Sequence, residues 1–426
     1  MIKIYEKASM KNEDIFIRST SSPDVCDIVR NIIADVIENG DAAVKKYEEK
    51  FDKCILESLE VTEDEIEQAW ASVDAEFIEV MEKAAKNIIF YHQHQKREGF
   101  RINKDNGCIL GQKIIPLHRA GLYVPGGTAA YPSSVLMNCI PAKIAGVDEI
   151  IMTTPPNAEG KINPIILCAA KIAGVDRIFK VGGSQAIAAL AYGTESIPKV
   201  DKIVGPGNAF VAEAKRQVFG IVNIDMIAGP SEILIVADES CDERNVAADL
   251  LSQAEHDRLA SAVLVTPSRD LAQRVAKELE VQLSVLPRED IARTSVDNNG
   301  KIIICESIDE CIDIANDIAP EHLEVCVDEP IQYLDKIRNA GSVFLGKNTP
   351  EALGDYFAGT NHTLPTGGTA RFSSPLSVDD FIKKYSYTYY TKDALMDVAS
   401  DIEYFAEREG LSAHARSVTV RRKEEK

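Results

Sequence analysis

The sequence predicts an α/β protein with two doubly wound parallel-sheet domains, Rossmann-like but incomplete, and small helical extensions at its N- and C-termini. Three observations carry this prediction. From Gly121 onward, short β-rich runs alternate with helical runs. The segment AKIAGVD occurs twice, and a second alternating series begins near residue 233. Repeated strand-then-helix units build parallel sheets whose two faces are covered by helices.

The first hundred residues are predicted to be mainly helical. DVCDIVRNIIADVIENGDAAVKKYEEKF carries apolar residues at helical spacing, with a break at Gly40–Asp41. A second amphipathic stretch runs from Glu63 to Gln95. His92 and His94 are two residues apart and do not share a helix face, so they are interpreted as solvated surface residues.

The first alternating series has four expected strands, each followed by a helical run: GLYVPGG, EIIMTTP, RIFKVGG and KIVGPGN. The copies of AKIAGVD, at 142–148 and 170–176, both lie where a helix ends and the next strand begins. They indicate adjacent units of one sheet.

The second series continues the alternation with the expected strands ILIVAD, SAVLVTP, KIIICES, LEVCV and SVFLG, and helical runs between them that include IQYLDKIRNA. A Gly/Thr/Asn-rich stretch follows from Gly354 to Pro375. The end of the chain, with DFIKKYSY and DALMDVASDIEYFAEREG, is expected to be a helical tail. We therefore expect an N-terminal extension at 1–20, a first α/β domain at 21–122 and 234–372, a second at 123–233, and a helical tail at 373–426.

The bulk composition excludes several classes of protein. A chain of 426 residues exceeds one ordinary core, and 45% hydrophobic with 27% charged residues is typical of globular proteins. A net charge of −20 argues against nucleic-acid binding. No stretch has the length of a membrane span and the N-terminus lacks an apolar signal region, so a cytoplasmic protein is expected. Nine cysteines without a C-x-x-C pair suggest free, mostly buried thiols in a reducing compartment.

Three glycine-rich turns join an expected strand to an expected helix, at 123–127, 181–185 and 204–208. The free N–H groups and positive dipole end of a helix N-terminus can hold a phosphate. Glycines can equally serve a tight turn alone, and no GxGxxG is present, so both interpretations stay open here.

Four segments carry side chains suited to metal binding or proton transfer. In DLLSQAEHD, Gln253 and His256 are three apart and project from one helix face. In PEHLE, Glu321 and His322 follow a proline, at the expected carboxyl edge of the sheet, and suit two separate proton transfers. The remaining two segments are the long polar loop GDYFAGTNHTLPTGGTAR, with Asp355 and His362, and EGLSAHARS, with Glu409 and His414. Taken singly, each has an ordinary structural explanation, such as a capped helix end with a surface histidine.

Together and in this order, the motifs resemble histidinol dehydrogenases from about residue 20 onward. The likeness rests on these segments and on YVPGGTAAYPSSVLM, VGGSQAIAALAYGT, KIVGPGNAFV and AGPSEILIVAD. It implies oxidation of L-histidinol to L-histidine through L-histidinaldehyde, the last two steps of histidine biosynthesis, using NAD+ and one Zn2+ per subunit.

The resemblance also implies a role for each site residue. Zinc ligands would be Gln253, His256, Asp355 and His414, and the catalytic pair would be Glu321 and His322. The cofactor would contact Tyr123, Gln185 and Asn208. Substrate contacts would come from Ser231, Gln253, His256, His322, Asp355, Glu409 and His414. The first α/β domain would then carry the metal and catalytic residues, the second would face the cofactor, and the tail of one subunit of a homodimer would complete the partner's site.

Two other functions use some of the same residues. A zinc hydrolase could employ Glu321 to activate water on an amide, but it needs no dinucleotide site. A non-catalytic two-domain binding protein would tolerate the loss of Glu321 and His322. Cys139 could serve as a nucleophile in aldehyde oxidation, but its place on an apolar helix favours core packing.

Overall fold

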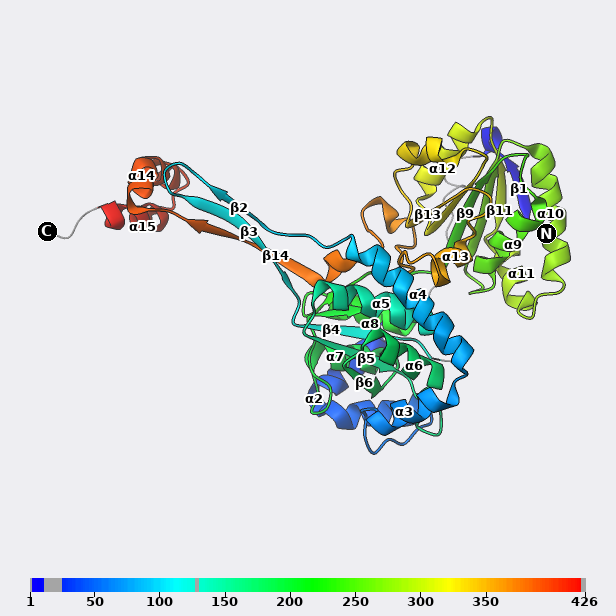
Figure 1. Ribbon diagram of the computed structural model, residues 1–426, viewed down its shortest axis with the longest axis horizontal. Helices are drawn as coiled ribbons and strands as arrows, with labels where there is room; N and C mark the ends of the chain where they lie inside the picture. Colours follow the sequence, from blue (N-terminus) through cyan, green and yellow to red (C-terminus); the bar gives the residue numbers. More distant parts are fainter. Residues whose placement is uncertain (1, 11–24, 127–129, 423–426) are drawn as a thin grey trace. The chain divides into compact units, whose positions relative to one another are not determined.

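The computed structural model describes residues 2–10, 25–126 and 130–422, and it divides the chain into two compact units. The first unit comprises the described residues of Met1–Gln95 and Leu117–Phe381 and holds two parallel sheets. The second comprises those of Lys96–Pro116 and Ile382–Lys426 and holds a small antiparallel sheet (Figure 1). The predicted α/β class with two parallel-sheet domains is confirmed.

The six-stranded sheet is parallel throughout, in the order β1-β11-β10-β9-β12-β13. Its strands are β1 (Lys3–Glu6), β9 (Glu232–Ala237), β10 (Ser261–Thr266), β11 (Lys301–Ile304), β12 (His322–Cys326) and β13 (Ser342–Leu345). Apart from β1, the strand order reverses between β9 and β12, as in a doubly wound sheet. The inner strands β9 to β12 are short and almost wholly buried, because helices cover both of their faces, whereas the edge strands β1 and β13 are partly exposed.

The five-stranded sheet is also parallel and has the order β6-β5-β4-β7-β8. Its strands are β4 (Arg119–Tyr123), β5 (Glu149–Thr154), β6 (Arg177–Lys180), β7 (Lys202–Val204) and β8 (Asn223–Ile224). Here the order reverses between β4 and β7. Both sheets therefore have the predicted doubly wound topology, and each lacks the sixth sequential strand of a full Rossmann sheet.

Helices pack on both faces of each sheet and bury separate cores (Figure 1). The helices around the five-stranded sheet are α2 (Cys26–Phe51), α3 (Glu63–Ser72), α4 (Ala75–Gln93), α5 (Pro132–Ala145), α6 (Pro164–Ala173), α7 (Gly183–Tyr192) and α8 (Ala209–Val218). The helices around the six-stranded sheet are α9 (Glu243–Ala254), α10 (Arg269–Leu283), α11 (Glu289–Asn298) and α12 (Ile308–Ile318), and the short α13 (Glu351–Tyr356) follows β13. The repeated segment AKIAGVD ends α5 and α6, where Gly146 and Gly174 adopt the left-handed conformation that closes a helix.

The expected assignment of 21–122 to the first α/β domain is wrong for its helices. Helix α2 packs on α7 and α8, while α3 and α4 pack on α5 and α6, all around the five-stranded sheet. Strand β4 also joins that sheet, beginning at Arg119 rather than at 123. The apolar faces of these helices match a sheet that the chain builds later, and helical periodicity alone does not name the surface that a helix covers.

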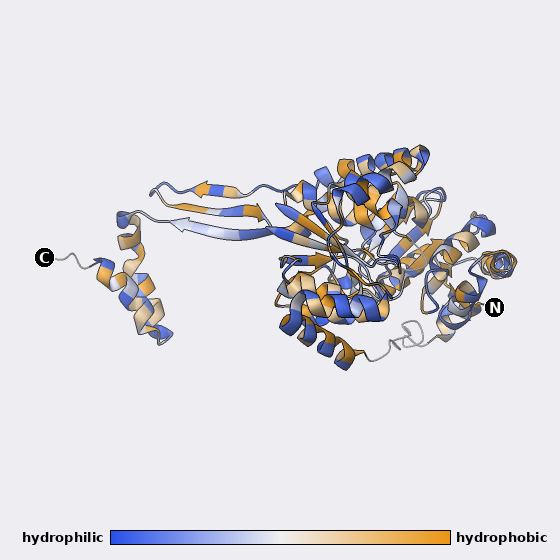
Figure 2. Ribbon diagram, turned by 90° about the horizontal axis from the view of Figure 1, so that it is seen from below, coloured by the Kyte–Doolittle hydropathy of each residue, from blue (hydrophilic) through white to orange (hydrophobic). Residues whose placement is uncertain are grey.

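The second unit contains a feature that the predicted helical tail did not include. Strand β14 (Ile382–Tyr389) pairs antiparallel with β3 (Ile109–Pro116), which pairs with β2 (Phe100–Asn103). Among the described residues of this unit, the helices are α14 (Lys392–Arg408) and α15 (Ser412–Arg422), and hydrophobic residues lie among hydrophilic ones along both (Figure 2). The segment DFIKKYSY was thus assigned wrongly, because IKKYSYTY is rich in tyrosine and β-branched residues that favour a strand.

Several smaller expectations also have an outcome. Residues 3–6 of the expected N-terminal extension form an edge strand of the six-stranded sheet, and 11–24 lie outside the described residues. IQYLDKIRNA forms a 3-10 turn, Pro330–Lys336, rather than an α-helix. His92 is buried, against expectation, and bonds Gln95. All nine cysteines are free and eight are buried. Among the described residues, no helix is both long and apolar enough to cross a membrane.

Candidate functional site

A cavity of about 350 Å³ in the first unit is lined by residues from one edge of each parallel sheet. Glycine turns that follow β4 and β7 bring in the carboxyl edge of the five-stranded sheet. Residues just before β9 and at the start of β12 bring in the amino edge of the six-stranded sheet. Of the site residues proposed from sequence, those lining the cavity are Ser231, Gln253, His256, Glu321, His322, Asp355 and His362.

The sequence had placed Glu321 and His322 at the carboxyl edge of the sheet, which is wrong. Helix α12 ends at Ile318, Ala319 takes a left-handed conformation, and Pro320 prevents the helix from continuing. His322 is then the first residue of β12, so the pair lies at the amino end of its strand. The usual carboxyl-edge rule for α/β sheets therefore holds for the five-stranded sheet alone.

His322 is held as a neutral base by its surroundings. Its Nδ1 lies 2.9 Å from the backbone carbonyl oxygen of Glu232, which can only accept a hydrogen bond, so Nδ1 carries the proton. Burial lowers the pKa of His322. Its Nε2 is buried and has no hydrogen-bond partner in the protein. That nitrogen is an acceptor available to a ligand in the cavity.

Glu321 is held by the backbone of Glu232, the same residue that holds His322. Its Oε2 accepts a hydrogen bond of 2.9 Å from the N–H of Glu232 and lies 3.7 Å from His322 Nδ1. Burial first, and then the neighbouring carboxylates, raise the pKa of Glu321 well above that of an ordinary glutamate. A carboxyl group with a raised pKa keeps its proton more readily than an ordinary glutamate, and its deprotonated form is a stronger base.

The other candidate ligands come from two helices. Gln253 lies in the last turn of α9 and is buried, whereas His256 follows the helix and is exposed. Their spacing brings both into the cavity from one end of α9, as expected. Asp355 lies on α13 and is partly buried.

Glu351 is a residue that the sequence interpretation missed. It is buried on α13, one turn before Asp355. Burial raises the pKa of Glu351, but His322, Asp355 and Gln253 together lower it below its usual value. It also accepts a 3.0 Å hydrogen bond from Ser252 Oγ. The i,i+4 spacing of Glu351 and Asp355 places both on one helix face, and this signal could have identified it.

These groups fit a divalent cation. One ligand atom each of His322, Glu351 and Asp355 lies within 4.8 Å of the others. Oε1 of Glu351 and Nε2 of His322 are both buried without a hydrogen-bond partner, 3.8 Å apart. Burial and the neighbouring Glu351 raise the pKa of Asp355, and a cation bound between the two carboxyl groups would compensate their charge. The oxygen and nitrogen donors of Gln253, His256 and Asp355 suit zinc.

His362 orients the loop that carries it and faces the cavity. Its Nδ1 lies 3.2 Å from the backbone oxygen of Asp355, and its Nε2 lies 3.3 Å from Ser134 Oγ on α5. Burial lowers the pKa of His362 to about 4, so it is neutral. Both ring nitrogens are engaged, which favours a positioning role over proton transfer.

Glu409 and His414 belong to the second unit and are exposed. Glu409 caps the end of α14, and His414 lies in the first turn of α15. Every described residue that lines the 350 Å³ cavity belongs to the first unit. Within one chain, the cavity thus contains three of the four expected zinc ligands.

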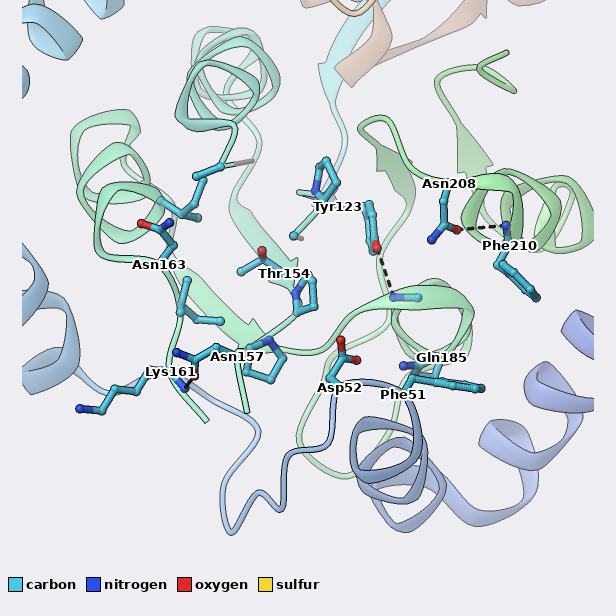
Figure 3. Close-up of a pocket in the computed structure, with 18 of the residues that line it drawn as sticks. Phe51, Asp52, Tyr123, Thr154, Asn157, Lys161, Asn163, Gln185, Asn208 and Phe210 are labelled. Atoms are coloured by element: carbon cyan, nitrogen blue, oxygen red, sulfur yellow. Dashed lines mark hydrogen bonds between the residues drawn. The ribbon is translucent and has the colours of Figure 1, made fainter. Parts of the chain in front are cut away.

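A larger cavity of about 820 Å³ lies at the carboxyl edge of the five-stranded sheet (Figure 3). It is lined by all three residues expected to contact the cofactor, Tyr123, Gln185 and Asn208. Pro125 and Gly126 line this cavity and the smaller one. The two cavities are therefore neighbours across one turn.

The glycine turns use their N–H groups internally, which bears on the phosphate hypothesis. At the start of α7, Gly182 N–H donates to Glu48 and Gly183 N–H donates to the hydroxyl of Tyr123. Gly205 N–H donates to Asp225. In the turn at 123–127, Gly127 lies outside the described residues. The turns at 182–183 and 205 are thus already paired, and these N–H groups are not aimed at a phosphate.

The Asn208 side chain is likewise used within the protein, because it caps the N-terminus of α8. Its Oδ1 accepts from the N–H groups of Phe210 and Val211 (Figure 3). Cys139 is fully buried, and burial raises the pKa of its thiol to about 12, in line with core packing rather than nucleophilic catalysis.

Comparison with known proteins identifies the family. The profile of the family described as histidinol dehydrogenase matches residues 17–422. A histidinol dehydrogenase of Clostridium acetobutylicum is 53% identical over 426 residues, 99% of each chain. That of Lactiplantibacillus plantarum is 58% identical over 92% of each chain. The crystal structure of the Elizabethkingia anophelis enzyme superposes with a TM-score of 0.94 at 41% identity, covering 99% of this chain and 98% of that one. The chain therefore belongs to the histidinol dehydrogenase family and is an oxidoreductase.

Proposed function

We propose that this enzyme oxidises L-histidinol to L-histidine in two NAD-linked steps at a zinc-containing site. The observation that carries the proposal is the buried Nε2 of His322. It has no partner in the protein, faces Glu351 and Asp355, and lines a cavity adjoining a second one large enough for a dinucleotide. The family membership supports histidinol as the substrate.

Gln253, His256 and Asp355 would hold zinc, together with His414 of the partner subunit in a homodimer. Glu351 lies close enough to Gln253 and Asp355 for both to lower its pKa, and it would help to hold their oxygens in a binding orientation. When bound, zinc would hold the imidazole and amine of histidinol and so fix the position of its hydroxymethyl group. Ser231 lines the same cavity, and Glu409 of the partner subunit would add a carboxylate for the cationic substrate.

His322 would act in the first oxidation. The alcohol loses a hydride from carbon and a proton from oxygen, giving the aldehyde. His322 Nε2 takes that proton, while Nδ1–H stays bonded to the carbonyl of Glu232 and keeps the ring in place.

Glu321 would act in the second oxidation. Its carboxylate takes a proton from water as the water oxygen adds to the aldehyde carbon, and the former carbonyl oxygen takes up a proton, giving the gem-diol. Loss of a second hydride and of two protons then gives the carboxylate of histidine. Tyr123, Gln185 and Asn208 would hold NAD+ in the larger cavity, where it would supply the hydride acceptor for each oxidation. We further expect a cytoplasmic homodimer, with neither nucleic acid nor membrane as a partner.

The test is formation of NADH from NAD+ and histidinol, followed at 340 nm with zinc-loaded protein. Absence of NADH would contradict the dehydrogenase proposal, and hydrolysis of a histidine amide instead would favour a zinc hydrolase. The function of a non-catalytic binding protein would not change on loss of Glu321 or His322.

The roles of the pair can be separated with one variant. In Glu321→Gln, oxidation of histidinol to the aldehyde should continue while conversion of the aldehyde to histidine falls by about 100-fold or more. The two steps are measured separately by supplying histidinol or histidinaldehyde. If Glu321→Gln blocked only the oxidation of the alcohol, the assignment of the two bases would be reversed.

A further inference from the structure

The lining of the 820 Å³ cavity has an uneven distribution of charge. Among its described lining residues, the charged side chains are Asp52 and Lys161. In the view of Figure 3, Asp52 lies with Gln185 and Phe51 on one side of the cavity, and Lys161 lies on another. A dinucleotide in this cavity would therefore meet a carboxyl group at one place and a lysine ammonium group at another.

Asp52 is supported by a second acid behind it. Glu48 lies one turn earlier at the end of α2 and is fully buried, and the carboxyl groups of Glu48 and Asp52 each affect the pKa of the other. Glu48 Oε1 accepts from the Gln185 side-chain amide at 2.8 Å and from Gly182 N–H at 3.2 Å. No N–H or hydroxyl donor reaches Glu48 Oε2. A proton on Glu48 therefore resides on Oε2, because Oε1 already accepts two hydrogen bonds.

Burial affects the protonation of both carboxyl groups. Burial raises the pKa of Glu48 to about 8. Burial also raises the pKa of Asp52, and the neighbouring Glu48 offsets part of that rise. Glu48 therefore holds its proton near neutral pH, and Asp52 is the carboxyl group of the pair that lines the cavity. Oε1 of Gln185, which is 1% exposed and lines the same cavity, also lacks a hydrogen-bond partner. A ligand with hydroxyl donors would satisfy both groups.

The position of Asp52 indicates which half of a dinucleotide it meets. Hydride transfer requires the nicotinamide near the substrate cavity, and Pro125 and Gly126 are the residues that line both cavities. Asp52 lines only the larger one. Phe51, beside it, lines the cavity with a half-exposed ring on which a base can stack. This end suits the adenosine half.

We propose that Asp52, backed by Glu48, accepts hydrogen bonds from the adenosine ribose hydroxyls and thereby selects the unphosphorylated dinucleotide over its 2′-phosphorylated form. A carboxylate accepts from a ribose diol, and it repels a 2′-phosphate at the same position. This inference rests on the proposed function, because it assumes that the dinucleotide occupies this cavity.

The test is equilibrium binding of NADH and NADPH to the full-length protein, followed by the fluorescence of each ligand. The wild-type protein should bind NADH more tightly than NADPH. In Asp52→Asn, the preference should narrow by about tenfold, because the repulsion of the 2′-phosphate is removed. Asp52→Glu keeps the charge and should keep the preference. The matched control is Glu49→Gln, which removes a charge from an exposed position of the same helix turn and should leave both affinities unchanged.

Lys161→Met separates failure of this inference from failure of the cavity assignment. Loss of the cation should weaken NADH and NADPH alike, since both carry the diphosphate. If Lys161→Met weakens both ligands while folded Asp52→Asn keeps the wild-type preference, the selective role of Asp52 is refuted and the cavity assignment stands. If neither variant changes either affinity, the dinucleotide binds elsewhere and both proposals fall.

Discussion

A buried ion pair holds the glycine turn that follows β7, and its removal should be costly. Lys215 Nζ pairs with Asp225, and their side chains are 3% and 1% exposed. Lys215 also donates to Gly205 O at 3.0 Å, and Asp225 accepts from Gly205 N–H at 2.7 Å. Gly205 has a φ of 115°, and a Cβ there would lie 2.0 Å from Tyr123 O. The pair thus clamps a backbone conformation that only glycine allows.

Lys215→Met keeps the length of the side chain and removes its charge. Asp225 would then be a buried carboxylate without a cation, and Gly205 O would lose a donor. Removing one partner of a buried ion pair costs about 3–5 kcal/mol of unfolding free energy. The double variant Lys215→Met/Asp225→Asn should recover more than half of that loss, because no unpaired charge remains.

Urea unfolding followed by tryptophan fluorescence measures the loss of unfolding free energy in the part of the protein that contains the ion pair. The chain has one tryptophan, Trp70 on α3, which packs against a core of the five-stranded sheet. The control is Arg216→Met on the same helix, whose ion pair with Glu213 is half-exposed and should be worth no more than about 1 kcal/mol. If Lys215→Met costs no more than Arg216→Met, the reasoning about the buried pair is refuted.

Three further predictions concern the metal, pH and the partner subunit. Glu351→Gln should weaken zinc binding by about 10- to 100-fold in chelator competition, whereas exposed Glu329→Gln should not; equal affinities would exclude a supporting role for Glu351. Burial raises the pKa of Glu48 from 4.5 to about 8, so its contribution to stability is complete below pH 4.5 and is lost as the pH rises through 8. The melting temperature of Glu48→Gln should thus fall less steeply between pH 5 and 9 than that of the wild type, and equal slopes would argue against the raised pKa. His414→Asn and Asp355→Asn chains that are mixed and refolded together should regain about a quarter of wild-type activity. Half of the dimers would then contain one chain of each kind, and each such dimer keeps one of its two sites intact. No recovery of activity in confirmed mixed dimers would place His414 in its own subunit's site.

The local patterns predicted much of the fold correctly. Buried β-branched runs and helical runs in alternation are a property of neighbouring residues, so the strands and most helices of both sheets could be read from them. The same holds for the pairing of Gln253 with His256, which depends on the pitch of one helix. The strand β14 was missed because a short tyrosine-rich segment gives little periodicity.

What remained undetermined depended on contacts between distant segments. Helices α2–α4 carry apolar faces but no mark of the sheet they cover. The amino-edge position of Glu321 and His322, by contrast, could have been predicted from the sequence, because the pair precedes the expected strand LEVCV. Glu351 is polar in sequence and gains its importance only from burial against Asp355 and His322.

By itself, the sequence determined the fold class, the family and the chemical types of side chain in the site, because these depend on local order along the chain. Only the tertiary structure decided that the carboxyl edge of one sheet and the amino edge of the other supply one cavity. It also decided that the glycine turns are paired internally and that Glu48 lies behind Asp52. Burial and hydrogen bonding set the proton positions of such groups, and both arise only when segments far apart in the chain are packed together.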